Sequence, residues 1–128
     1  MTEHSGHIDA FCANNLPPRD LWPEMDYTSL PDLAYPPRLN CAADLLDNAV
    51  RSGLGDNTVF LYEGSRWSYA DLLRTANRIA HVLVEDLGLV PGNRVLLRAP
   101  NTPMLAACWF AVLKAGGVVV ATMPLLRP

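Results

Sequence analysis

The spacing of apolar residues predicts two amphipathic helices in the middle of the chain. Asn40 is expected to cap the first, which runs to about residue 52 and ends at Gly53 and Gly55. Its apolar face consists of Ala42, Leu45, Leu46, Ala49 and Val50. The second helix spans about residues 69–87, between the capping-box pair Ser68 and Asp71 and the terminating Gly88. Its apolar stripe is Leu72, Leu73, Ala76, Ile79, Ala80, Leu83 and Val84, opposite Arg74, Arg78, His81 and Glu85.

Two pairs of short strands accompany these helices. Residues 58–62 and 66–68 are expected to form a hairpin around a tight turn at Gly64 and Ser65. Residues 94–99 and 118–122 are separated by a third helix, which Thr102 caps and Gly116 ends. The connection between these two strands is long enough to contain a whole helix, which favours a parallel pair. Residues 118–122 (VVVAT) show no alternation of apolar and polar side chains, which predicts a strand buried on both faces.

The third helix, over residues 103–115, has almost no polar face. Its large apolar residues are Met104, Leu105, Cys108, Trp109, Phe110, Val112 and Leu113. A helix of this kind must be buried on several sides, and the elements predicted around it are too few to bury it. The pattern therefore predicts the α/β class, with a β-hairpin and a parallel β-α-β unit that form one part of a larger layered domain.

The first 39 residues differ from the rest. They contain six of the eleven prolines, which excludes long helices and inner strands. They also carry apolar residues in a number too high for a solvated linker: Phe11, Leu16, Leu21, Trp22, Met25, Tyr27, Leu30, Leu33 and Tyr35. We interpret residues 1–39 as an extended, proline-rich arm that lies on a globular body, and residues 40–128 as an incomplete α/β segment.

Composition and charge restrict the kinds of molecule that the chain is expected to bind. Half of the 128 residues are apolar and 18% are charged, which is typical of a globular chain. Residues 41–128 are nearly neutral and have no basic stripe, so nucleic acid is not an expected partner. No helix pairs a lysine-rich face with an apolar one, and the longest apolar run is too short to span a bilayer, so a membrane is not expected either. Cys12, Cys41 and Cys108 are odd in number and widely spaced, which favours free thiols and the cytoplasm.

Residues with catalytic potential are isolated from one another. His4 and His7 do not make a closed metal-ligand set, and His81 lies among surface charges of a helix. Cys108 lies among large apolar side chains and is interpreted as an inert core thiol. Lys114, the only lysine, lies at a helix end, where its charge complements the helix dipole. The residues alone therefore predict no catalytic group and no metal site.

Several stretches resemble the beginning of the acyl- and aryl-adenylating ligases. These are WSYADL (67–72), NRIA (77–80), GNRV (92–95), APNTP (99–103) and LKAGGV (113–118). Four further stretches are similar to the benzoate-CoA ligase branch, and most of all to 2-aminobenzoate-CoA ligases: NLPP (15–18), YPPRLN (35–40), LGLVPG (87–92) and MPLLR (123–127). The resemblance implies that residues 40–128 belong to the large N-terminal AMP-binding domain of such an enzyme.

The resemblance also implies a reaction and its cofactors. An aromatic carboxylic acid would react with ATP, aided by Mg²⁺, to form an acyl-adenylate, and the thiol of CoA would then displace AMP. The family's ATP loop, its acidic ribose- and metal-binding groups and its mobile C-terminal domain with a lysine have no counterpart in these residues. We therefore expect the chain alone to be inactive and to bind none of these cofactors tightly. Arg127 is a candidate contact for a CoA phosphate, or else an exposed arginine at the start of a helix.

Three readings of the chain follow. The first is an N-terminal fragment of an aryl-CoA ligase that needs the remainder of the enzyme, and whose apolar surface around Trp109 and residues 118–120 drives self-association. The second is a stand-alone binding or interaction module from a shortened gene. The third is one half of a ligase assembled from two chains.

Overall fold

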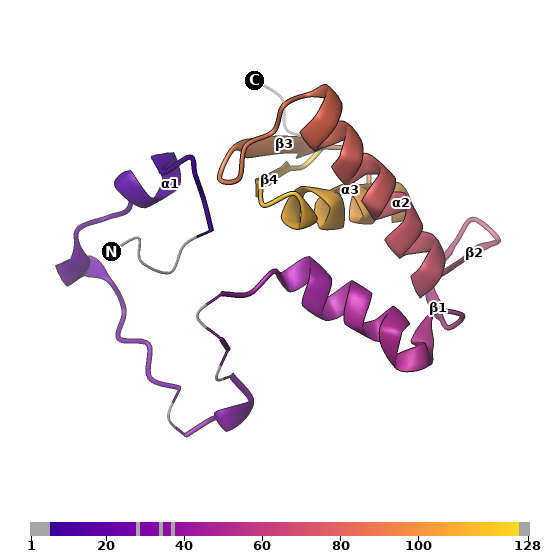
Figure 1. Ribbon diagram of the computed structural model, residues 1–128, viewed down its shortest axis with the longest axis horizontal. Coiled ribbons are helices and arrows are strands. Elements are labelled where there is room, and N and C mark those ends of the chain that lie inside the picture. Colours follow the sequence, from indigo (N-terminus) through magenta and orange to yellow (C-terminus); the bar gives the residue numbers. More distant parts are fainter. Residues whose placement is uncertain (1–5, 28, 34, 37, 126–128) are drawn as a thin grey trace.

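The computed structural model describes residues 6–27, 29–33, 35–36 and 38–125 (Figure 1). Two helices pack against each other at its centre, α2 (Tyr69–His81) and α3 (Pro103–Lys114). The strands are β1 (Thr58–Tyr62), β2 (Ser65–Ser68), β3 (Arg94–Arg98) and β4 (Val118–Thr122). The shorter helical segments are α1 (Phe11–Asn14), η1 (Arg19–Leu21), η2 (Pro31–Leu33), η3 (Ala43–Asp47), η4 (Val50–Leu54) and η5 (Val82–Asp86).

Both predicted strand pairs are confirmed. β1 and β2 form an antiparallel hairpin that turns at Glu63 and Gly64, one residue earlier than expected. β3 and β4 are parallel and in continuous register from Arg94 opposite Val118 to Arg98 opposite Thr122, with α3 as the crossover between them. Thr102 caps α3 as predicted, since its hydroxyl accepts a hydrogen bond of 3.2 Å from the Leu105 amide.

The first predicted helix is present but is wound differently from expectation. The Asn40 side-chain oxygen accepts hydrogen bonds from the Ala42 and Ala43 amides at 3.1 and 3.2 Å, which confirms the cap. Most of the helix over residues 41–54 is π-helical, in η3 and η4. A π turn holds more residues than an α turn. A residue four positions away therefore still shares the face, but a residue three positions away no longer does. Ala42 and Leu46 are therefore buried, whereas the prediction for Leu45 is wrong, because its side chain is 62% exposed.

The capping box of α2 forms as its sequence predicts. The Asp71 amide donates to the Ser68 hydroxyl at 3.1 Å, and the Ser68 amide donates to the Asp71 carboxylate at 3.0 Å. At its other end α2 continues into η5. The helical segment ends just before Gly88, whose backbone has a left-handed conformation (φ +63°). Val84, predicted on the buried stripe, is exposed because the π turn of η5 shifts that stripe.

The capping box should make stability depend on acid pH. Hydrogen bonds from the Ser68 amide and hydroxyl, with a smaller contribution from Arg74, hold the pKa of Asp71 below its usual value of 3.8. A lowered pKa in the folded state stabilises the chain above the ordinary carboxyl range, and this contribution is lost as pH falls through the folded-state value. We expect Asp71→Asn to lower the free energy of unfolding at pH 7 and to reduce its loss between pH 7 and about pH 3. Urea unfolding at both pH values measures this, with the exposed Asp86→Asn as control. Equal pH dependence in both variants would contradict it.

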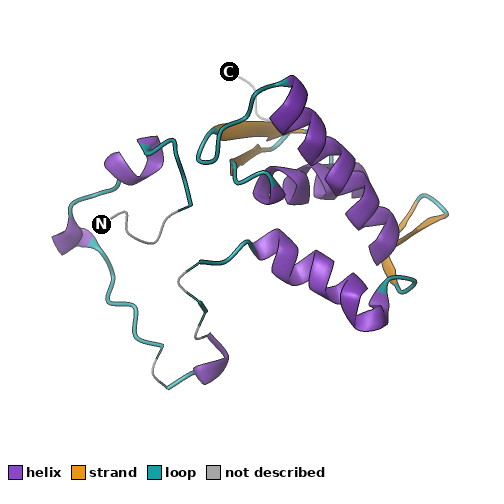
Figure 2. Cartoon of the chain, in the orientation of Figure 1, coloured by secondary structure: helices purple, strands orange, loops and turns teal. Residues whose placement is uncertain are grey.

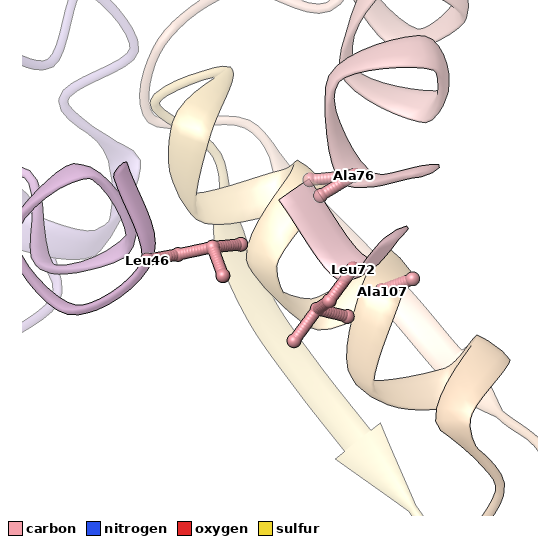
Figure 3. Close-up of a cluster of buried hydrophobic side chains, with 5 residues drawn as sticks. Leu46, Leu72, Ala76 and Ala107 are labelled. Carbon is pink, nitrogen blue, oxygen red and sulfur yellow. The ribbon is translucent and has the colours of Figure 1, made fainter. Parts of the chain in front are cut away.

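Small residues bring the central helices close together. The buried core consists of Leu46, Leu72, Ala76, Ala107 and Ala111. Figure 3 shows Leu46 reaching from its helix toward α3, with Leu72 and Ala76 on α2 beside Ala107. The alanines of α2 and α3 let the two backbones approach, so this part of the chain has a close-packed core of its own.

The predicted burial of β4 on both faces is not met within the described residues, whereas α3 is only partly covered, as the small number of predicted elements around it led us to expect. Val120 on β4 is 40% exposed, and Met104 and Trp109 on α3 are 49% and 42% exposed. The cause is the small number of layers: β4 pairs with β3 alone among the described strands. Apolar side chains of α3 and β4 therefore face outward. No helix in the described ranges combines the length and the apolar character needed to cross a membrane.

The arm touches the body at its two ends and loops away between them (Figures 1 and 2). Residues 8 and 9 lie against the turn before β3, and the last residues of the arm lead into the helix over residues 41–54. Most of the apolar side chains that were expected to anchor it are instead exposed: Leu16, Leu21, Trp22, Met25, Tyr27, Leu30 and Tyr35. Phe11 is exposed as well, but its ring lies against Arg94 of the body.

Candidate functional site

A large open cavity lies where residues 6–7 and 38–41 meet the turn between α3 and β4. Its volume is about 820 Å³. The arm side is lined by Gly6, His7, Arg38, Leu39, Asn40 and Cys41. The body side is lined by Pro91, Trp109, Leu113, Lys114, Ala115, Gly116, Gly117, Val118 and Val119. The walls are therefore mostly apolar, with a few basic side chains.

Two polar contacts fix the floor of this cavity. The Asn40 side-chain amide donates to the Leu113 carbonyl at 2.9 Å, so the residue that caps one helix also binds the end of another. The Lys114 ammonium group donates to the Asp47 carboxylate at 2.6 Å and is mostly buried. Lys114 therefore neutralises Asp47 and joins the two helices, in addition to its expected position at the end of α3. A lysine engaged in this way is not available to bind phosphate.

The lining residues do not form a catalytic arrangement. Among the described lining residues no carboxylate is present to serve as a base or to hold a cation. Cys41 is exposed, and no contact pairs its thiol with a base. Across the described residues, three or more metal-ligating side chains do not gather in one place.

The residues singled out from the sequence remain apart in the structure. Arg127 and His4 lie outside the described residues. His81 is on the exposed side of α2, and Cys108 is partly buried on α3, where burial raises the pKa of its thiol. A raised pKa keeps the thiol protonated at neutral pH, so it is a poor nucleophile.

The sequence did not predict one polar cluster, which joins the arm to the beginning of β3. Asp9, in the arm, binds Asn93 in the turn before β3 and Arg94, the first residue of β3, although they lie 84 and 85 positions away in the sequence. The only local signal was the Pro91–Gly92 pair, which indicates a turn but not its partner. This cluster forms one margin of the cavity, because neighbouring Gly6, His7 and Pro91 line it.

Comparison with known proteins places the chain in a family. A family model described as AMP-binding enzyme matches residues 45–128, about two thirds of the chain. The chain belongs to the AMP-binding enzyme family. The resemblance to adenylate-forming ligases found in the sequence is thereby confirmed.

Two curated relatives illustrate the range of this AMP-binding family. The acetyl-coenzyme A synthetase of Deinococcus radiodurans is 38% identical over 84 residues, which cover 62% of this chain and 13% of the relative. The benzoate–CoA ligase of Thauera aromatica is 30% identical over 96 residues, which cover 75% of this chain and 18% of the relative. The chain thus spans less than a fifth of the length of these relatives.

A solved structure confirms the fold class. Apo MatB from Rhodopseudomonas palustris matches with a TM-score of 0.60 and 27% identity, over 69% of this chain and 17% of that one. The matched region corresponds to the N-terminal domain of adenylate-forming enzymes, and the mixed α/β architecture follows it.

The family name implies a nucleotide, and the described residues do not fit one. The main cavity has neither a glycine-rich loop in front of a helix N-terminus nor an acidic pair for a ribose and a metal ion. Two of its three glycines, Gly116 and Gly117, follow the C-terminus of α3, where the negative end of the helix dipole repels phosphate. We therefore assign no step of nucleotide chemistry to these residues.

Proposed function

We propose that this chain is the N-terminal part of an ATP-dependent aryl acid–CoA ligase and is inactive by itself. One observation carries the aryl assignment. Residues 45–128 number 84, so the 96-residue match to the benzoate–CoA ligase of Thauera aromatica extends at least 12 residues further toward the N-terminus. The match to the acetyl-coenzyme A synthetase covers 84 residues. An alignment that enters the end of the arm favours an aromatic acid, either benzoate or 2-aminobenzoate.

The proposed enzyme activates its acid in two steps. A carboxylate oxygen of the acid attacks the α-phosphorus of ATP, and pyrophosphate leaves as the acyl-adenylate forms. The sulfur of CoA then attacks the acyl carbon, and AMP leaves with the electron pair of the broken bond. Mg²⁺ would balance the phosphate charge, and Arg127 would contact a phosphate of CoA.

In this proposal the described residues have a structural part. Residues 40–128 contribute one α/β layer, on which the rest of the AMP-binding domain packs, and residues 1–39 form the arm. The outward-facing apolar residues of α3 and β4 support this role, because such surfaces occur where another layer is packed. We propose a cytoplasmic enzyme without nucleic acid or membrane as partners.

Capture of the native polypeptide tests the proposed activity. An antibody against residues 1–128 isolates the protein from its own cells, and exchange of labelled pyrophosphate into ATP is measured with benzoate, 2-aminobenzoate or acetate. We expect exchange that depends on an aromatic acid in the captured protein, and none with the isolated 128-residue chain. Exchange with acetate alone would contradict the aryl assignment. Exchange by the isolated chain would contradict its inactivity.

A further inference from the structure

The start of the arm is bound to the turn before β3 by main-chain hydrogen bonds. The Ile8 and Asp9 amides both donate to the Pro91 carbonyl at 2.9 Å. Two consecutive donors on a single acceptor fix the direction of the arm across the turn. These bonds do not depend on side chains, so they provide affinity without selectivity.

The contacts of the Asp9 carboxylate make the site selective for a segment with an acidic residue at this position. It accepts hydrogen bonds from the Phe11 amide at 2.9 Å and from the Asn93 side chain at 2.8 Å, and it forms an ion pair with Arg94. These contacts, that of the Phe11 amide foremost, hold the pKa of Asp9 below its usual range. The carboxylate is therefore charged at neutral pH, and it is matched on the body by an amide and a guanidinium group.

The ring of Phe11 packs against the guanidinium group of Arg94. The Arg94 guanidinium carbon lies 4.5 Å from the centre of the Phe11 ring. Arg94 thus contacts both an acidic residue and, two positions later, an aromatic one. Stacking on a guanidinium group that is already ion-paired adds a cation–π contribution.

Gly92 makes the approach of the arm possible. A Cβ atom at this position would lie 2.3 Å from the Asp9 carbonyl oxygen, and the backbone has φ +96°. The turn is held in shape by the body, through a 2.8 Å hydrogen bond from the Gly92 amide to the Gly116 carbonyl. The Asn93 side-chain oxygen also accepts from the Val90 amide at 2.9 Å. The turn is therefore pre-organised to receive a peptide.

We propose that residues 91–94 form a recognition site for a peptide segment that carries an aspartate and, two residues later, an aromatic residue at the start of a helical turn. In this chain the segment is residues 8–11 of the arm, and the site with its bound segment is called the arm clasp. Because the middle of the arm loops away from the body, the clasp closes residues 15–39 into a loop and holds Gly6 and His7 at the margin of the 820 Å³ cavity. Since the segment is tethered by this loop alone, the emptied site should accept the same segment from solution.

Amide hydrogen exchange of the full chain tests the contact. Gly92→Ala is expected to abolish the protection of the Ile8 and Asp9 amides and to leave that of α2 and α3 unchanged. Gly88→Ala is the matched control, because Gly88 also has a positive φ (+63°) but nothing within 4 Å of its Cβ position. On the arm side, Asp9→Asn should also reduce protection, whereas the exposed Asp20→Asn should not. Protection of Ile8 and Asp9 that is the same in wild type and Gly92→Ala would overturn the proposal.

A labelled peptide of residues 6–15 tests recognition separately. The double variant Asp9→Asn Phe11→Ala weakens the segment but leaves the turn intact, and it should bind the peptide about tenfold more tightly than wild type, whose own arm competes. Adding Gly92→Ala to this variant should abolish binding, while adding Gly88→Ala should not. A peptide with asparagine in place of its aspartate should not bind. Equal binding with and without Gly92, or with either peptide, would overturn the proposal.

Discussion

Replacing Leu72 with alanine is expected to lower the free energy of unfolding of the chain by about 3 kcal/mol. Leu72 is 1% exposed and lies in the core with Leu46 and Ala107. Removing its side chain would leave a void between helices whose backbones are already close, and alanines on both sides cannot expand to fill it. Urea unfolding followed by circular dichroism measures the change.

The control for this prediction is another leucine of the same chain. Leu61 lies on β1 with 81% of its surface exposed, so Leu61→Ala should change the free energy of unfolding by less than about 0.5 kcal/mol. Similar losses from the two substitutions would mean that the α2–α3 contact is not the core of an independently folded unit.

The isolated chain is expected to self-associate through the outward-facing residues of α3 and β4. Trp109 and Val120 are large apolar residues that remain exposed although they belong to elements with almost no polar residues. Burying such a surface removes apolar area from water, so a second copy is a favourable cover when no other layer is present. Light scattering at high concentration should give a mass at least twice the 14.0 kDa of the chain.

A pair of double variants locates that association. Trp109→Lys Val120→Lys should restore a monomer, because two charges oppose burial of the surface. Leu21→Lys Met25→Lys adds the same charge and removes two exposed apolar residues from the arm, so it should leave the association unchanged. A wild-type chain that stays monomeric, or a monomer produced by the arm variant instead, would contradict this prediction.

Features set by neighbouring residues could be predicted from the sequence. The Ser68–Asp71 capping box, the Thr102 cap and the parallel pair around α3 depend on short-range chemistry and on the handedness of crossovers. The exposure of Leu45 could not be predicted, because the apolar spacing of a helix does not reveal π winding. The burial expected for both faces of β4 is not met, because the described chain has only β3 beside it.

The arm clasp could not be predicted from sequence patterns, for a different reason. Asp9 and Arg94 are ordinary charged residues 85 positions apart, and no periodicity links them. The glycine between Pro91 and Asn93 indicated a turn, while its actual requirement is the close approach of Asp9. The choice between benzoate and 2-aminobenzoate is not visible in these residues for a simpler reason, because the two acids differ by a single amino group.

The mass of the native polypeptide tests the central proposal most directly. Antibody raised against residues 1–128 would detect it in the cells that make it. The proposal that this AMP-binding family member works as part of a complete ligase predicts a single band several times heavier than 14.0 kDa. A band at 14.0 kDa would contradict it, and would mean that the α/β layer and its arm act without the rest of a ligase in the same chain.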